Sequence, residues 1–544
     1  MIDRKFILYA ILGIVLFALW NAWQVDYGKT KDNLSTNTPS FSQTQAHPQT
    51  ETPNTITINK PKNGKIIKVS TDVLDVYINT AGGNIVKAEL PKYPEELHGE
   101  KPIRILSDDP SDLYFIQSGL INKDSSIDKQ VNYTSTKNNY TLSPGEKQLT
   151  VNLYSDDKNL FITKSFTFTK QKYDIAVNYN VKNQTNSEWQ GKFYNQIVRK
   201  NTAPASGMFA LNTYNGASIS SPETPYEKIS YSSMDKENLN RDIKGGWVGM
   251  QQRYFLSAVI PDKNKNYHYY SYKNTEDGSY TIGFNDNALA ISPGEKMDIG
   301  TTFYVGPEIS ENLEPLANGL DHTVDYGWLW VISIVLLWIM KKIHLMVGNW
   351  GWSIVLLTVL IKLVFYKLSE KSCCSMARMK DLAPKIQALK ERYGDDKQKL
   401  SQATMEIYKK EKVNPLGGCL PMLVQIPFFI ALYYVLIGAV ELRQAPFIFW
   451  IHDLSVKDPY YILPILMGIA AFIQQKLSPP ASPDPAQAKM MMLMPVMFTI
   501  FFLSFPAGLV LYWMTNNCLQ VLQQWHINKK LLNHKNHRKI KDKQ

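Results

Sequence analysis

The chain has 544 residues and a formal net charge of +11, with 59 Lys or Arg against 48 Asp or Glu. A hydrophobic share of 44% and an aromatic share of 12% exclude a disordered chain, and four cysteines, none of them in the long polar middle, exclude a disulfide scaffold. A single soluble globule is also excluded, because the polar middle alternates with stretches that lack Asp, Glu, Lys and Arg: 6–25, 343–361, 413–440, 459–475 and 490–528.

Residues 1–27 predict an uncleaved signal-anchor span. Two basic residues precede its apolar run, and such a pair holds the N-terminus inside. Trp20 and Trp23 stand where a cleaved signal peptide has small residues. Residues 28–59 then predict a flexible tether, because they are rich in Ser, Thr, Asn, Gln and Pro and have too few apolar side chains to pack.

Residues 60–322 predict an antiparallel β-sandwich that is long enough to bury its own core. Leu74, Val76 and Ile78 alternate with polar residues, and Gly82-Gly83 then turns the chain. A second stripe of the same period consists of Tyr173, Ile175, Val177, Tyr179 and Val181. The pattern therefore indicates strands with one buried face.

Residues 323–347 predict an amphipathic helix at the membrane surface. Their apolar core "GWLWVISIVLLWIM" (327–340) has 14 residues, whereas a crossing helix needs about 20. The alternative is a further span, which would place the basic loop 370–415 and the basic tail 529–543 outside. If the N-terminal span and the five later spans cross the membrane while this helix lies on its surface, the chain has six spans. Both basic segments then face the cytoplasm, as the positive-inside rule requires. The β domain is then periplasmic.

Residues 348–528 predict a membrane core of five helices. The expected spans are 349–369, 416–438, 459–475, 490–505 and 508–526. The sequence "FPAG" divides the last uncharged stretch, which as one helix would be about twice as long as a bilayer core is thick. A cytoplasmic helical hairpin at 372–413 follows the first of these spans, and the basic tail 529–544 follows the last.

Lys362 is the most informative single residue, because it lies inside the first core span. A cation there costs about 2.5–3.5 kcal/mol on insertion scales. It either faces a wet cavity or a partner, or it extends toward the headgroups together with Lys367. Thr358, Gln425 and Asn516 are polar groups in the spans, which either line a hydrated groove or form interhelical hydrogen bonds of about 0.6 kcal/mol each.

The hairpin carries apolar residues at helical spacing: Met379, Leu382, Ile386 and Leu389. Gly394 is expected to end its first helix, and Asp395 or Asp396 to cap its second. The hairpin either rests on anionic lipid or forms a mobile element that receives a hydrophobic or acidic partner.

The tail is strongly basic, with Lys529, Lys530, Lys535, Arg538 and Lys539. It could bind ribosomal RNA or lipid phosphates, or it could only enforce topology. The adjacent Cys373 and Cys374 lack metal-ligand spacing and are expected to be packing residues. The chain contains no Gly-rich phosphate loop and no HExxH or GxSxG motif, so we expect neither a catalytic site nor a cofactor.

Several segments, among them "VGNWGWSI", "YGDDKQKLSQ", "KVNPLGGCLPMLVQIPFFIALYY" and "FPAGLVLYW", closely resemble the YidC/Oxa/Alb family of membrane insertases in its Gram-negative form. The resemblance implies a periplasmic β-super-sandwich, an interfacial helix and a five-helix core. It also implies a groove, open to cytoplasm and lipid, where a cation attracts polar or acidic client segments. Lys362 aligns with the usual Arg of that groove and lacks its planar fork. Thr358 and Gln425 match other groove positions, and Trp513 replaces a Tyr.

The resemblance therefore implies a membrane protein insertase and chaperone of the bacterial inner membrane, with both termini in the cytoplasm. The implied partners are nascent membrane proteins, the Sec translocon, the ribosome and anionic lipids, and we expect a functional monomer. Two other classes stay open. A transporter or channel would need carboxylates in the spans, which are missing there. A membrane-anchored, sugar-processing or sugar-binding enzyme would need a cleft with paired acids in the β domain.

Overall fold

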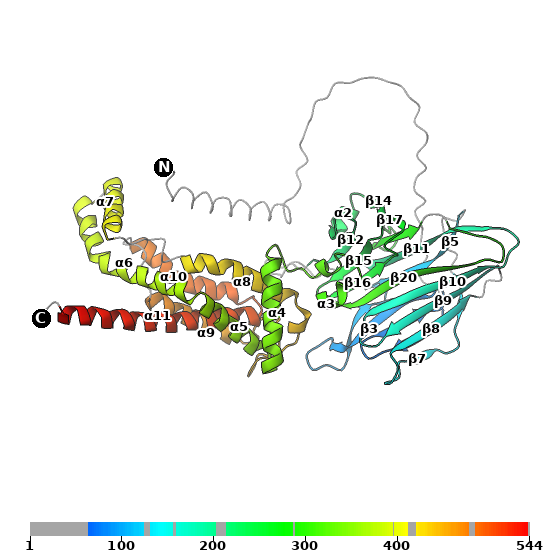
Figure 1. Ribbon diagram of the computed structural model, residues 1–544, viewed down its shortest axis with the longest axis horizontal. Coiled ribbons are helices and arrows are strands. Elements are labelled where there is room, and N and C mark those ends of the chain that lie inside the picture. The colour runs from blue at the N-terminus through cyan, green and yellow to red at the C-terminus, as the bar shows by residue number, and fades with distance from the viewer. Residues whose placement is uncertain are drawn as a thin grey trace, which may run out of the picture. The chain divides into compact units, whose positions relative to one another are not determined.

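The computed structural model contains a β domain that is followed along the chain by a group of helices (Figure 1). It describes residues 64–123, 131–155, 159–202, 214–286, 289–394, 396–411, 420–477 and 485–541. The N-terminal span and the tether expected at 1–27 and 28–59 lie outside these residues.

The first sheet of the β domain has 11 strands among the described residues. In spatial order they are β14 (Asn240–Lys244), β17 (Asn266–Lys273), β18 (Ser279–Asp286), β11 (Trp189–Lys200), β5 (Tyr114–Asn122), β3 (Asn84–Pro94), β2 (Asp75–Asn79), β1 (Ile66–Ser70) and β7 (Asn139–Thr141), with β19 (Leu289–Ile291) paired to β11 and β4 (Pro102–Leu106) paired to β3.

The second sheet has nine strands among the described residues. Their order is β13 (Glu227–Ile229), β12 (Gly216–Ser220), β15 (Trp247–Gln252), β16 (Phe255–Ile260), β20 (Lys296–Pro307), β10 (Asp174–Asn183), β9 (Leu160–Thr169), β8 (Gln148–Ser155) and β6 (Tyr133–Thr134). Neighbours pair antiparallel in both sheets, except that β1 pairs with β7 in parallel. The predicted antiparallel sandwich is therefore confirmed apart from this one edge pair.

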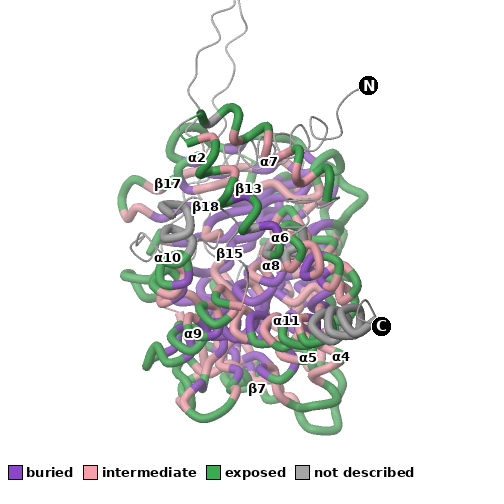
Figure 2. Tube along the Cα trace, turned by 90° about the vertical axis from the view of Figure 1, so that its left-hand side faces the viewer, coloured by how far each residue is buried: buried purple, intermediate pink, exposed green. Residues whose placement is uncertain are grey.

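The core of the β domain lies on the faces that the sequence pattern predicts. Val76 and Ile78 on β2 are fully buried, and so are Val177 and Tyr179 on β10. Figure 2 shows the buried residues running through the interior, for example along β15. Gly82 adopts a φ of +86°, a backbone conformation that side chains disfavour, which explains the glycine pair at this turn.

The helical part begins after β20 with short elements that connect it to the β domain. These short elements are α3 (Ser310–Leu313) and η1 (Asp321–Thr323). Two other short helices lie elsewhere: α2 (Tyr231–Met234) between β13 and β14, and η3 (Val440–Leu442) between α8 and α9. The longer helices are α4 (Trp330–Val347), α5 (Trp350–Val364), α6 (Tyr366–Tyr393), α7 (Lys397–Lys410), α8 (Leu420–Gly438), α9 (Ile462–Leu477), α10 (Pro485–Phe502) and α11 (Ala507–Lys541).

Length and apolar content single out only a few of the described helices as membrane-crossing. One helix, α4, meets both conditions alone, and α5 meets them together with the start of α6, from which it is bent by 64°. The apolar parts of α8, α9 and α10 are shorter. The number of six spans and the interfacial place of 323–347 therefore stay predictions.

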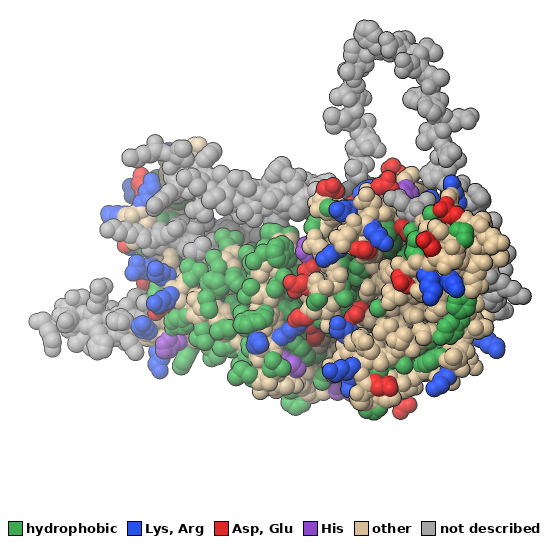
Figure 3. All heavy atoms as spheres, turned by 45° about the vertical axis from the view of Figure 1, so that its right-hand side comes forward, with side chains coloured by type: hydrophobic (Ala, Val, Ile, Leu, Met, Phe, Trp, Pro, Cys, Tyr) green, Lys and Arg blue, Asp and Glu red, His purple; other side chains and the backbone are tan. Residues whose placement is uncertain are grey.

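Much of the surface of the helical part is apolar. Figure 3 shows hydrophobic side chains gathered over the middle of this part and Lys or Arg side chains at its end, whereas charged side chains are scattered over the β domain. Ile465, Ile469 and Ile473 on α9 are among the exposed apolar residues, as are Met497 and Ile500 on α10. Large exposed apolar patches of this kind mark contact with a membrane or another apolar partner.

Two predicted helix boundaries differ from the structure. The expected span 349–369 is broken, since α5 ends at Val364 and α6 begins at Tyr366. The Phe365 ring packs edge-on against Phe428 of α8 at 5.2 Å between centroids, which fixes the chain at the bend. The first hairpin helix therefore starts before residue 372. The break at "FPAG" is confirmed, because α10 ends at Phe502 and α11 begins at Ala507.

Candidate functional site

Lys362 lies in the last turn of α5. The helix is started by Asn349, whose side-chain oxygen accepts a hydrogen bond from the Trp352 N–H at 3.0 Å. Lys362 Nζ donates a hydrogen bond to Gln520 Oε1 on α11 at 2.8 Å. The Lys362 side chain thereby reaches across to α11.

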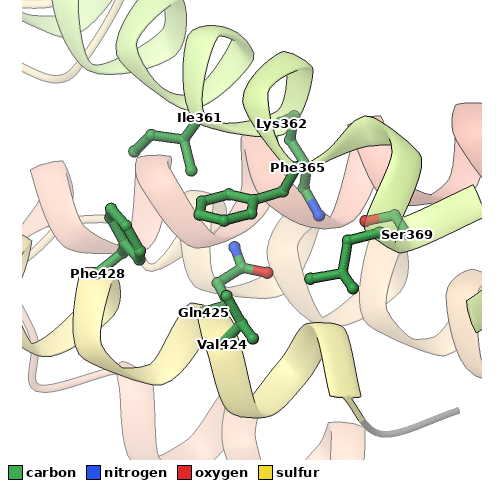
Figure 4. A pocket seen from close by; sticks show the side chains of 8 residues that line it. Ile361, Lys362, Phe365, Ser369, Val424, Gln425 and Phe428 are labelled. Carbon is green, nitrogen blue, oxygen red and sulfur yellow. The ribbon is translucent and has the colours of Figure 1, made fainter. Parts of the chain in front are cut away.

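Lys362 lines a small, partly open pocket whose cavity volume is about 20 Å³, room for about one water molecule. It lies between α5, the start of α6 and α8, and its lining consists of Ile361, Lys362, Phe365, Leu368, Ser369, Val424, Gln425 and Phe428. Figure 4 shows the Lys362 side chain reaching toward the space between Gln425 and Ser369. The pocket thus combines an apolar wall with a cation, an amide and a hydroxyl.

Gln425 connects this pocket to α11. Its side-chain nitrogen donates hydrogen bonds to the Tyr512 hydroxyl, at 3.2 Å, and to Asn516 Oδ1. Tyr512 and Asn516 are both buried. Hydrogen bonds from Gln425 and Lys362 therefore reach three successive turns of α11, at Tyr512, Asn516 and Gln520.

Two predicted groove residues are placed differently. The Thr358 hydroxyl is buried and donates to the carbonyl of Ile354 one turn earlier, at 2.7 Å, so its hydrogen bond stays within α5. Trp513 is half-buried and packs edge-on against Phe429 at 4.8 Å between ring centroids. Neither residue lines the pocket around Lys362.

Gln520 was not among the predicted site residues, although a sequence signal for it exists. Tyr512, Asn516 and Gln520 recur every four residues, which places them on one face of α11. Polar side chains at this spacing, within a stretch that carries no charged residue, are typical of a helix that borders a polar site. Ser369 carries no comparable signal, because it lies beyond the bend at Phe365.

The electrostatics around Lys362 are unusual for a helical bundle. Within the described part of the chain, none of the ion pairs includes Lys362. Its hydrogen-bond acceptor is a neutral amide, and its own side chain is only half-exposed. The helices α5, α8, α9, α10 and α11 contain no Asp or Glu. The positive charge in the pocket is therefore not neutralised by a carboxylate among the described residues.

The hairpin residues have a structural place in the interface between α6 and α7. Leu382 and Ile386 are buried against Met379, Ile407 and Tyr408. Leu389 is half-buried. Gly394 ends α6, and the Asp396 side chain caps α7 by accepting a hydrogen bond from the Lys399 N–H at 3.1 Å. The structure thus selects Asp396 for the cap; Asp395 lies outside the described residues.

The basic tail belongs to the end of α11. The Lys530 ammonium lies 3.5 Å from a carboxylate oxygen of Glu370, and Lys529 lies over the Trp525 ring. The side chains of three further predicted tail residues, Lys535, Arg538 and Lys539, are outside the described residues. Cys373 is buried and Cys374 is half-buried.

Two buried acids in the β domain bear on the sugar-enzyme alternative. Burial raises the pKa of Asp286 to about 7 and that of Glu308 to about 8. Asp286 accepts a hydrogen bond from the Phe193 N–H at 2.7 Å, and Glu308 accepts one from the Gln251 side chain at 3.0 Å. The two acids therefore have different hydrogen-bond donors, the backbone amide of Phe193 for Asp286 and the side-chain amide of Gln251 for Glu308. The described residues contain no cluster of three or more metal-ligating side chains.

Comparison with known proteins covers both parts of the chain. A family model described as the YidC periplasmic domain matches residues 66–339, and one described as the 60Kd inner membrane protein matches residues 328–535. The "Membrane protein insertase YidC" of Coxiella burnetii (strain Dugway 5J108-111) is 51% identical over 98% of this chain and 97% of its own length. The protein of the same name from Legionella pneumophila (strain Lens) is 48% identical over 99% of both chains. A solved structure of an active YidC insertase covers 85% of this chain and 95% of its own, with 16% identity and a TM-score of 0.38.

Proposed function

This chain belongs to the YidC family of membrane protein insertases, and from that premise we propose that it inserts nascent proteins into the bacterial inner membrane through the pocket around Lys362. The pocket and the polar face of α11 would form the hydrophilic groove. Clients would enter from the cytoplasm and leave sideways into lipid.

The observation that carries this proposal is the charge of Lys362. Its ammonium is half-buried among apolar helices and is held by the neutral Gln520 amide at 2.8 Å. An ammonium at this depth costs about 2.5–3.5 kcal/mol. A client segment that brings a carboxylate would offset part of this cost, because the two opposite charges attract strongly in a poorly hydrated site.

The neutral groups of the pocket fit the same role. Gln425 offers an amide and Ser369 a hydroxyl inside the pocket, and Asn516 offers an amide on the adjoining face of α11. These groups can hydrogen-bond water or a client backbone, which would lower the cost of carrying a short polar segment part of the way across the membrane. The apolar surface of α9 and α10 would then contact lipid or the spanning helix of the client.

We further propose that α4 lies on the outer surface of the membrane. Figure 1 shows α4 running across the ends of α5 and α8 rather than alongside them, which supports an interfacial position. With the N-terminal span and five core spans, the basic hairpin and tail would then face the cytoplasm. There they could meet ribosomal RNA or anionic lipids, and the protein could act alone or with the Sec translocon.

The first test is insertion by the purified protein in liposomes. A freshly translated protein with two spans and an acidic translocated segment serves as the client, and insertion is scored by protease protection. We expect insertion above empty liposomes, a clear loss with Lys362→Ala, and retention with Lys362→Arg. Equal insertion by all three proteins would contradict the role of Lys362. No insertion by any of them would contradict the insertase function and favour solute-flux assays for a transporter.

A further inference from the structure

We propose that Gln520 is a positioning residue for Lys362: its neutral side chain holds the ammonium toward the groove and keeps its charge available for a client carboxylate. This inference rests on the proposed function of the groove and extends it to a residue with no assigned role. It concerns how the site selects acidic client segments.

The geometry of the pair is specific. Lys362 Nζ and Gln520 Oε1 are 2.8 Å apart, although the two residues are 158 positions apart in the chain. Gln520 is half-buried on the face of α11 that also carries Tyr512 and Asn516. A lysine ammonium has three N–H donors on a flexible stem, so one acceptor fixes its direction and leaves two donors for a client.

The neutral character of Gln520 matters as much as its position. A glutamine oxygen accepts a hydrogen bond from the ammonium and leaves the net charge of the pair at +1. A glutamate of nearly the same shape would form an ion pair with Lys362 and cancel that charge. A client carboxylate would then have to displace an ion pair, which is stronger than the present hydrogen bond between Lys362 and Gln520. The identity of residue 520 therefore sets how strongly the groove attracts acidic segments.

The test separates charge from structure with two variants and two clients. Gln520→Glu keeps the shape and the acceptor but neutralises the pair, and Gln520→Leu removes the acceptor and keeps the charge. One client carries Asp or Glu in its translocated segment, and the other has Asn or Gln at the same positions. The matched control is Gln523→Glu, which adds the same charge on α11 at a side chain that contacts the Tyr366 carbonyl instead.

The expected result depends on the client. Gln520→Glu should slow insertion of the acidic client roughly tenfold, and Gln520→Leu about threefold, while the neutral client inserts at the wild-type rate. Gln523→Glu should not discriminate between the clients. Wild-type insertion of the acidic client by Gln520→Glu would overturn the inference. Equal slowing of both clients would overturn it too, because loss of packing produces that pattern.

A second measurement does not depend on insertion. Acylation of Lys362 by a small amine reagent, followed by mass spectrometry, reports on its surroundings directly. We expect slower acylation in Gln520→Glu and faster acylation in Gln520→Leu, relative to wild type. Unchanged rates in both variants would overturn the contact even if the protein proves not to be an insertase. Absence of wild-type insertion with altered acylation would instead reject only the proposed function.

Discussion

The Lys341 ammonium on α4 lies 2.8 Å from a carboxylate oxygen of Glu441 in η3. The same ammonium lies 2.7 Å from Glu311 in α3. Burial tends to raise the pKa of Glu311, but the hydrogen bond from Lys341, a backbone hydrogen bond and the charge of Lys341 together leave that pKa below its usual value. One lysine thus joins the segment after the β domain, the helix α4 and the loop after α8.

Replacing this lysine should destabilise the protein. Lys341→Met leaves two carboxylates facing each other without their shared cation, and we expect a loss of about 1–3 kcal/mol, between the values for exposed and buried pairs. Thermal unfolding of the full chain in mild detergent measures the loss as a lower Tm. The control is Lys342→Met, a neighbouring exposed lysine that belongs to no ion pair among the described residues. Equal melting of both variants would contradict the prediction.

The hydrogen bond between Gln425 and Asn516 should couple α8 to α11. We expect Gln425→Leu to cost about 1 kcal/mol, because it leaves the buried Asn516 oxygen without its donor. The coupling between the two positions should be about 0.6 kcal/mol, as for other hydrogen bonds between membrane helices. A double-mutant cycle with Asn516→Leu, followed by denaturant unfolding in detergent, measures it. Additive effects would show that the bond contributes nothing to stability.

Stability should depend on pH through Glu308. Burial raises its pKa in the folded protein from 4.5 to about 8, and the hydrogen bond from Gln251 offsets only part of that rise. Between these two values the folded state binds more protons than the unfolded state, so stability falls as pH rises and levels off above about 8. Glu308→Gln should therefore unfold at a higher temperature than wild type at pH 8, with a much smaller difference at pH 5. Asp286 is present in both proteins, so its contribution cancels. A Tm difference that does not change with pH would refute this prediction.

The stability of α7, the second helix of the hairpin, should depend on the side chain that caps its N-terminus. Asp396→Ala removes the acceptor of the Lys399 N–H and should cost α7 about 1 kcal/mol. Hydrogen exchange of the amides in Lys397–Lys410 should accelerate several-fold. The same substitution at Asp395, the other candidate from the sequence, is the control and should leave the exchange unchanged. Similar acceleration in both variants would assign the effect to charge rather than to capping.

Local patterns were enough to predict much of the architecture. The alternation at Val76 and Ile78 identified a buried strand face, because side chains of a strand point to opposite sides with a period of two. The proline and glycine of "FPAG" identified the break before Ala507. The cap at Asp396 was one of two candidates. Each of these features depends on neighbours in the sequence, and the same physics acts in any fold.

Only the tertiary structure decided which polar groups meet. Lys362 and Gln520 are 158 residues apart, and Gln425 and Asn516 are 91 apart, so no local period relates them. The sequence also predicted an unbroken span through Phe365, because apolar content does not report a bend that the packing of a distant ring imposes. The sequence thus determined that a cation lies among apolar helices. The packing of α5 against α11 decided that it is held by a neutral amide, because helix packing sets the contacts between segments that are distant in the chain.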